Sequence, residues 1–196
     1  MNLVKVARRL VAPALPLVAV PLLLAGPASA QTLHGTDTGH DVQKFDMSAF
    51  THKVAPAHAD ADLLRYTVDY GPRAIRVTET YRALDHSEPL LAVGGTFKLP
   101  DGSTHDLVLR AQKGNWRGTA KLQHRPACAI RHHLDYAKAQ SVIVVPASCL
   151  GTPAWVRFAA AAVTTDHWKK PTYFYADAAP AKSVTQDRYT ARIFRG

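Results

Sequence analysis

Residues 63–84 read LLRYTVDYGPRAIRVTETYRAL, and the alternation in this stretch decides the fold. The apolar positions are Leu64, Tyr66, Val68 and Tyr70 before the Gly71-Pro72 pair, and Ile75, Val77, Tyr81 and Ala83 after it. Strict alternation of apolar and polar residues is typical of a half-buried β-strand, and a Gly-Pro pair favours a turn. We therefore expect two antiparallel strands joined as a hairpin.

Glu79 breaks the pattern, because it falls on the apolar side of the second strand. A carboxylate at such a position either marks a frayed end of the core or is buried with a partner. We expect the frayed end.

Further strand patterns follow the hairpin as far as residue 163. They occupy residues 90–99, where Gly94-Gly95 is expected to interrupt the strand, and 104–110, 116–124, 128–134, 141–145 and 155–163. Leu107 and Leu109 are expected to face inward. The last pattern has Val156, Phe158, Ala160 and Ala162 on one face. Seven to nine short strands, with no convincing amphipathic helix, predict an all-β fold: a single antiparallel β-sandwich, jelly-roll or immunoglobulin-like.

The chain divides into four parts by composition. Residues 31–61 are rich in Gly, Thr, Asp, His and Ala, and we expect an irregular leader with one short strand. Residues 62–164 form the expected sandwich core. Residues 165–196 are a closing segment and tail, with an aromatic cluster at 173–175 and a last segment around 189–194.

Residues 1–30 have the three parts of a secretory signal peptide. Lys5, Arg8 and Arg9 precede an apolar run from residue 10 to residue 24, and Ala28-Ser29-Ala30 is a small-residue cleavage site. Four prolines within this segment argue against a membrane-spanning helix. We expect a secreted or extracellular protein, cleaved after Ala30, without a membrane span, and with the Sec or Tat route left open.

The mature chain is moderately basic. Cleavage would remove three of the 24 Lys and Arg residues and none of the 15 Asp and Glu residues, which leaves a net charge of +6. Positive charge suits anionic cell-wall polymers or glycans as partners. The basic residues are scattered and do not interleave with aromatic ones, so no specific nucleic-acid site is predicted.

The two cysteines, Cys128 and Cys149, are expected to pair, because disulfides persist in oxidising compartments. The alternative is a reactive thiol, which would need an unpaired Cys beside a His. A bridge between them would close a loop of about twenty residues and stabilise the fold by about 3 kcal/mol.

The segment around Cys149 has a specific pattern, V-P-x-S-C-L-G-x-P-x-W-V from Val145 to Val156. With Cys128, Asp135-Tyr136, Asp41-Val42 and Asp177-Ala178, it resembles a family of small secreted actinobacterial β-sandwich proteins without an assigned function. The position before Ser148 is usually Arg-like in that family and is Ala147 here, which removes a possible functional contact. The resemblance implies compartment and fold, and it implies no reaction.

The sequence contains residues for two kinds of binding site, one for a sugar and one for a metal ion. Aromatic side chains in or near expected loops could form a sugar-binding face, since rings stack on pyranoses; these are Trp116, Trp168, Tyr173 and Tyr175. A structural Ca²⁺ could lie between carboxylates of the leader and of the closing strand; the candidates are Asp41, Asp60, Asp62 and Asp177. No zinc-type spacing of Cys and His is found, so no other metal or cofactor is predicted.

The sequence favours a non-enzymatic module that binds something or has a structural role at the cell envelope. A carbohydrate-binding module is one alternative. A small secreted hydrolase is the other, and it would require Ser148 or a carboxylate to meet Asp166-His167 in one pocket. Ser148 lacks the G-x-S-x-G surroundings of a hydrolase nucleophile, so no catalytic residue is predicted.

Overall fold

The structure is a computed structural model that describes residues 30–125, 127–167, 170–180 and 188–196. The expected signal peptide lies outside the described residues, apart from Ala30. No helix in the described ranges is long and apolar enough to cross a membrane.

The described residues form β-strands and one 3-10 turn, η1, at Ala147–Leu150. The strands are β1 Gln31–Thr36, β2 Gln43–Asp46, β3 Thr51–Val54, β4 Leu63–Tyr70, β5 Ala74–Tyr81, β6 Leu90–Lys98, β7 Thr104–Gln112, β8 Asn115–Leu122, β9 Arg131–Asp135, β10 Gln140–Pro146, β11 Trp155–Thr165, β12 Tyr173–Ala179 and β13 Ile193–Phe194. The all-β class is confirmed, with more strands than expected.

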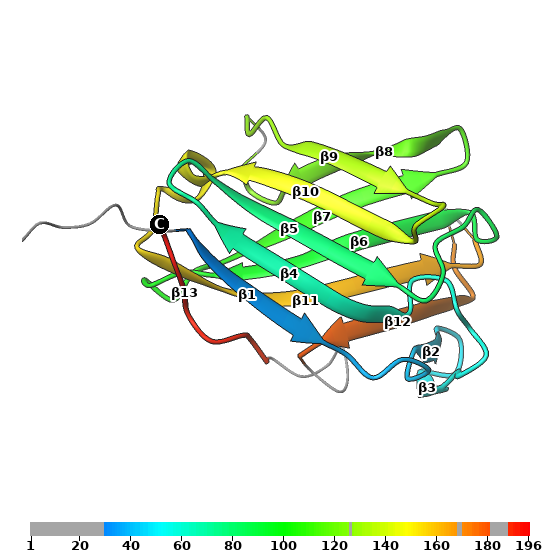
Figure 1. Ribbon diagram of the computed structural model, residues 1–196. Helices are drawn as coiled ribbons and strands as arrows, with labels where there is room; N and C mark the ends of the chain where they lie inside the picture. The colour runs from blue at the N-terminus through cyan, green and yellow to red at the C-terminus, as the bar shows by residue number, and fades with distance from the viewer. Residues whose placement is uncertain (1–29, 126, 168–169, 181–187) are drawn as a thin grey trace, which may run out of the picture.

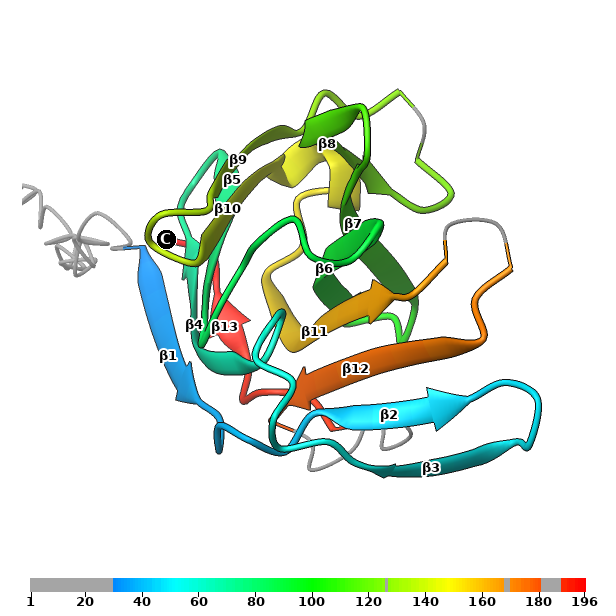
Figure 2. The same ribbon diagram turned by 90° about the vertical axis from the view of Figure 1, so that its right-hand side faces the viewer.

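Two antiparallel sheets pack face to face (Figure 1, Figure 2). The first sheet has five strands in the order β1-β4-β5-β10-β9. The second follows the order β3-β2-β12-β11-β6-β7-β8, and β13 also pairs with β11. The edge strands β8 and β9 belong to different sheets and lie close together at one side of the sandwich (Figure 2).

The hairpin predicted from residues 63–84 is present as the antiparallel pair β4 and β5. A register irregularity between Leu63 and Arg65 shifts the alternation by one residue at the start of β4. As a result Leu63 is buried in the core and Leu64 is only half-buried, which corrects the expected pattern at this end. From Tyr66 onward the alternation is as predicted.

The core lies between the sheets and consists of the inward side chains of their central strands. Leu107 and Leu109 are buried in it, as predicted, and so are Val156 and Phe158. Residues 159–162 belong to β11, which continues without interruption to Thr165.

The expectation that Glu79 marks a frayed end of the core is wrong. Its side chain is 0% exposed, and the hydroxyl groups of Tyr81 and Ser141 donate hydrogen bonds to Oε2 at 2.5 Å and 2.9 Å. These hydrogen bonds offset part of the cost of burying a polar group. Glu79 is therefore the centre of a polar group inside the sandwich.

Gly94 and Gly95 do not interrupt the third strand pattern, because β6 runs through both. A Cβ atom on Gly94 would lie 2.2 Å from the carbonyl oxygen of Leu107, and one on Gly95 would lie 2.0 Å from that of Ala159. The glycines thus allow the neighbouring strands β7 and β11 to approach closely on the two sides of β6.

The leader is not irregular, since it contains β1, β2 and β3 rather than one short strand. β1 pairs with β4 in the first sheet, whereas β2 pairs with β12 in the second. The turn at residues 37–42 therefore carries the chain from one sheet to the other.

The two ends of the described chain lie side by side at one end of the sandwich. The amide of Phe194 donates to Oε1 of Gln31 at 2.5 Å, and the amide of Gly196 donates to the carbonyl oxygen of Tyr70 at 3.1 Å. The turn η1 lies at this same end (Figure 1). The turn between residues 37 and 42 and the loop between β5 and β6 lie at the opposite end.

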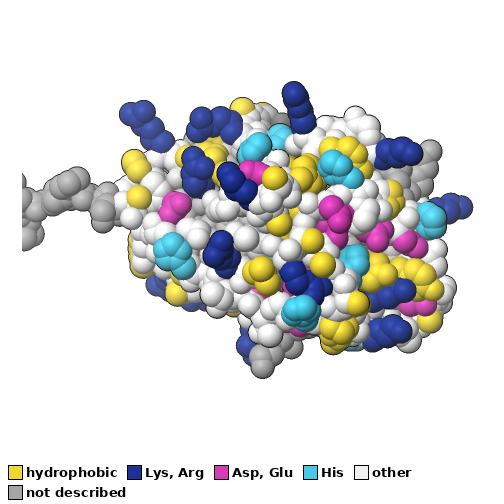
Figure 3. All heavy atoms as spheres, turned by 45° about the vertical axis from the view of Figure 1, so that its right-hand side comes forward, with side chains coloured by type: hydrophobic (Ala, Val, Ile, Leu, Met, Phe, Trp, Pro, Cys, Tyr) yellow, Lys and Arg dark blue, Asp and Glu magenta, His cyan; other side chains and the backbone are white. Residues whose placement is uncertain are grey.

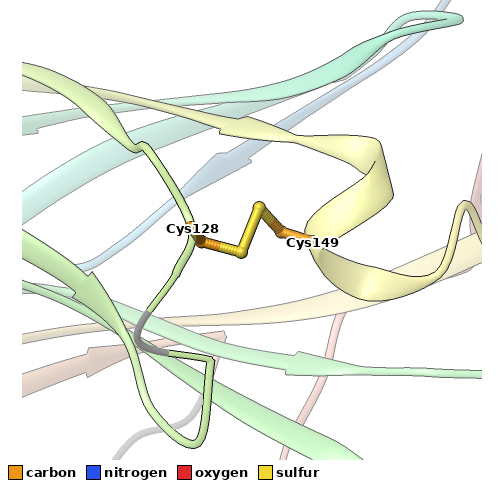
Figure 4. Close-up of a disulfide and its surroundings, with 2 residues drawn as sticks. All are labelled: Cys128 and Cys149. Carbon is orange, nitrogen blue, oxygen red and sulfur yellow. A yellow bond between two sulfur atoms is a disulfide. The ribbon is translucent and has the colours of Figure 1, made fainter.

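The predicted disulfide is present between Cys128 and Cys149 (Figure 4). The two Cα atoms are 5.8 Å apart, which is within the usual range for a bridged pair. Cys149 lies in η1, and Cys128 lies in the segment between β8 and β9. The bridge therefore ties this connection to the corner that leads into β11.

Candidate functional site

The edge strands β8 and β9 contact one another through side chains rather than through a backbone ladder. The Tyr136 hydroxyl donates to the Trp116 carbonyl oxygen at 2.7 Å. Nε2 of His132 lies 3.3 Å from the Gly118 carbonyl oxygen, and only a protonated Nε2 can donate there. Nδ1 of His132 is buried without a partner. These contacts leave a cleft between the two strands.

Three rings form one wall of the cleft. The His86 ring stacks on Trp116 with centroids 4.4 Å apart, and its edge contact with Tyr136 has a centroid distance of 4.3 Å. Burial, followed by the negative charge of Asp60, raises the pKa of Tyr136 to about 12. The hydroxyl of Tyr136 therefore stays protonated and keeps its hydrogen bond to Trp116 throughout the neutral range.

The cleft has a volume of about 610 Å³, which is within the range of small-molecule sites. Its lining consists of the three rings with Arg117, His132, His133 and Leu134, and it includes no carboxylate among the described residues. Arg117 and His133 are exposed. The cleft thus combines an apolar ring surface with one permanent positive charge and several imidazole groups.

The four aromatic residues proposed for a sugar-binding face do not form one site. Trp116 lines the cleft, but Tyr173 and Tyr175 lie on β12 in another part of the second sheet. Lys44 Nζ is 3.5 Å from the centroid of the Tyr173 ring, and His58 stacks on Tyr175 at 3.8 Å. Trp168 lies outside the described residues.

Sequence reasoning missed most of the cleft. His86 comes from the loop between β5 and β6, and Tyr136 comes from the turn after β9. The Asp135-Tyr136 pair was noted only as part of the resemblance. No regular spacing relates either residue to Trp116, so no sequence signal joins the three.

A group of carboxylates lies near the turn at residues 37–42, at the same end of the sandwich as the loop that carries His86. Asp37, Asp41 and Asp177 each place one carboxylate oxygen within 4.8 Å of the others, and Asp62 adjoins them. Figure 3 shows one face of the molecule, and acidic side chains gather on the right-hand half of that face among several histidines. Lys and Arg side chains are spread over the whole visible surface (Figure 3).

Of the four carboxylates proposed for Ca²⁺, the structure brings Asp41 and Asp177 together, with Asp37 as the third member of the group. Asp62 lies outside this group but close enough to add, by its charge, to the rise that burial causes in the pKa of Asp37 and of Asp41. Asp60 instead accepts a hydrogen bond from the Asp85 amide at 3.1 Å. Burial raises the pKa of Asp177 to about 7 and the pKa of Asp60 to about 6.

The residues named for a hydrolase do not converge. Asp166 and His167 are adjacent, with Oδ2 and Nε2 4.0 Å apart, and they follow β11. Ser148 lies in η1 before the start of β11. β11 has 11 residues and is about 36 Å long, so the two groups lie near opposite ends of the sandwich.

The fold and the cleft define a two-sheet, disulfide-linked β-protein with a ring-walled cleft between its edge strands. Comparison with protein-family models, curated proteins and solved structures gives no match for this chain.

Proposed function

We propose that this protein is a secreted, non-enzymatic binding module of the cell envelope, and that its β8–β9 cleft binds an acidic glycan. The observation that carries the proposal is the combination of an aromatic wall with Arg117 in a cleft whose described lining has no carboxylate. The apolar face of a sugar ring packs on aromatic rings, and an arginine pairs with a carboxylate or phosphate.

Two further features support secretion and the partner class. The disulfide is typical of proteins in oxidising compartments, and residues 1–30 have the pattern of an export signal. The net positive charge of the chain favours association with anionic polymers. Membership in the secreted actinobacterial family that the Cys149 corner resembles is part of the same proposal.

The test is a titration of the secreted protein with uronic-acid oligosaccharides and with neutral oligosaccharides of equal length. We expect saturable binding of the acidic series, measured by calorimetry, and retention on isolated wall polymers that falls between 50 mM and about 300 mM salt. Arg117→Ala should weaken the affinity at least about tenfold, since it removes a charged hydrogen-bonding partner.

Lys121→Ala is the matched control. Lys121 is also exposed and lies on the same strand as Arg117, but it does not line the cleft. Its loss should leave the affinity within about twofold. Equal affinity for acidic and neutral sugars, or an Arg117→Ala variant that binds like the wild type, would refute the proposed site.

A further inference from the structure

The carboxylates of Asp37, Asp41 and Asp177 meet where the chain passes between the two sheets. Asp37 and Asp41 lie in the turn after β1, and Asp177 lies on β12 of the second sheet. One oxygen from each lies within 4.8 Å of the other two. Asp177 also accepts a hydrogen bond from the Leu63 amide at 2.7 Å, which links β12 to β4 of the first sheet.

Asp62 is an independent sign that this group holds a ligand. Its side chain is 0% exposed, and its Oδ2 accepts the His40 amide at 2.9 Å and lies 3.0 Å from Nε of Arg82. Its Oδ1 is buried without a hydrogen-bond partner. That atom faces the turn, because it lies 3.9 Å from where a Cβ atom on Gly39 would be.

Two more oxygens of the group are buried without a partner, namely Oδ2 of Asp37 and Oδ1 of Asp41. A buried carboxylate oxygen without a partner is costly, and native proteins rarely leave several together. Three such atoms from neighbouring aspartates therefore indicate a missing electropositive partner.

The charges at this place do not balance. Among the described residues, Arg82 forms an ion pair with Asp62 and with none of the other three carboxylates, and the His40 ring contacts the guanidinium group of Arg82. Arg82 is also directed toward main-chain carbonyl oxygens, since it donates to the Pro56 carbonyl at 3.0 Å. One permanent positive charge is too little for four carboxylates in such proximity.

We infer that Asp37, Asp41 and Asp177 form a binding site for one Ca²⁺ ion beside the buried carboxylate of Asp62, and that the ion holds the β1–β2 crossover against β12. The donors are all carboxylate oxygens, the ligand type of hard cations. Ca²⁺ binds oxygen at about 2.3–2.6 Å, so ligands on opposite sides of the ion are up to about 5 Å apart. Mg²⁺ requires about 2.0–2.1 Å and a tighter octahedron.

The experiment measures thermal unfolding and calorimetric binding of the chelator-treated protein with CaCl2 or MgCl2. We expect one Ca²⁺ per chain and a rise in Tm of at least about 5 °C at saturating Ca²⁺, because an ion that binds only the folded state stabilises it. The same concentration of Mg²⁺ should produce less than half of that rise.

Asp41→Asn is the diagnostic variant, and Asp60→Asn is its control. Asn keeps the size of the side chain but removes a charge, so the calcium-dependent rise in Tm should largely disappear in Asp41→Asn. Asp60 is also buried and has an unpartnered oxygen, yet it lies outside the group. Its variant should keep the full rise, whatever its own Tm.

Three outcomes would overturn the assignment. They are an unchanged Tm of the wild type with Ca²⁺, an equal response to Mg²⁺, and an undiminished calcium response in Asp41→Asn. The site is separate from the β8–β9 cleft, so the glycan titration and the calcium titration succeed or fail independently.

Discussion

Glu79 shows how a single buried carboxyl group can govern the pH dependence of stability. Burial raises the pKa of Glu79 from its ordinary 4.5 to about 8, although the hydrogen bonds from Tyr81 and Ser141 act in the opposite direction. Between these pH values the folded protein keeps a proton that the unfolded chain has lost. The stability that protonated Glu79 adds to the folded state is therefore fully present below about pH 4.5. It is lost as the pH rises toward 8.

Glu79→Gln should remove this pH dependence. Gln keeps the shape of the side chain but cannot ionise. The free energy of unfolding of the variant should therefore rise relative to that of the wild type by about 1.4 kcal/mol for each pH unit between pH 5 and pH 8. The measurement is urea unfolding at a series of pH values. Asp37, Asp60 and Asp177 titrate in both proteins, so their effect cancels in the difference. If the free energies of unfolding of the two proteins change with pH in parallel, Glu79 is not the group that causes this pH dependence.

Among the elements, β6 depends on its two glycines. Gly94 has a φ of 133°, a backbone conformation that other residues rarely adopt, and the Leu107 carbonyl oxygen occupies the place of a Cβ atom. A side chain there would push β7 away from β6. The pair is thus a requirement of strand packing rather than a break in the strand.

Gly94→Ala should lower the free energy of unfolding by more than about 2 kcal/mol, because backbone strain adds to a steric clash. Gly102→Ala serves as the comparison. Gly102 also has a positive φ, of 85°, but no atom lies within 4 Å of its added Cβ. Gly102→Ala should lower the free energy of unfolding by about 1 kcal/mol, because only the backbone is strained. If both variants lower the free energy of unfolding equally in urea, the close approach of β7 to β6 does not explain why Gly94 is needed.

The strands that alternation predicted are those with one buried face. β4, β5 and β11 repeat with period two because every second side chain enters the core. Only one of the three strands in residues 31–61 was expected, because the side chains of β2 and β3 are half-buried or exposed and main-chain hydrogen bonds hold these strands without an apolar pattern. The burial of Glu79 was misjudged because its partner Ser141 is distant in sequence.

At the scale of the whole molecule, the disulfide acts through the unfolded chain. It joins residues 21 positions apart and limits the conformations available after unfolding. Replacing both Cys128 and Cys149 by Ala should lower the free energy of unfolding by about 3 kcal/mol, measured in urea. The same loss should follow reduction of the wild type. A loss below about 1 kcal/mol would mean that this loop is already ordered in the unfolded state.

The sandwich and the disulfide could be predicted, but the candidate sites could be predicted only in part. Asp41, Asp60, Asp62 and Asp177 were all named as carboxylates of the leader and the closing strand, and only Asp41 and Asp177 belong to the group that forms, with Asp37. The wall of the cleft depends on a loop, a turn and an edge strand that meet in space. Whether these segments come together depends on the order of the strands in the sheets. The alternation of apolar and polar residues does not predict that order.

Gly196 lies at the end of the sandwich opposite the carboxylates, so attachment through this residue sets which end of the protein faces a support. β4 runs from the end that holds the carboxylates to the end where the termini lie, over eight residues or about 27 Å. Immobilisation through Gly196, on a bead or a sensor chip, would direct the carboxylates and the loop that carries His86 away from the support. Long polymers could then reach the cleft without steric hindrance from the surface.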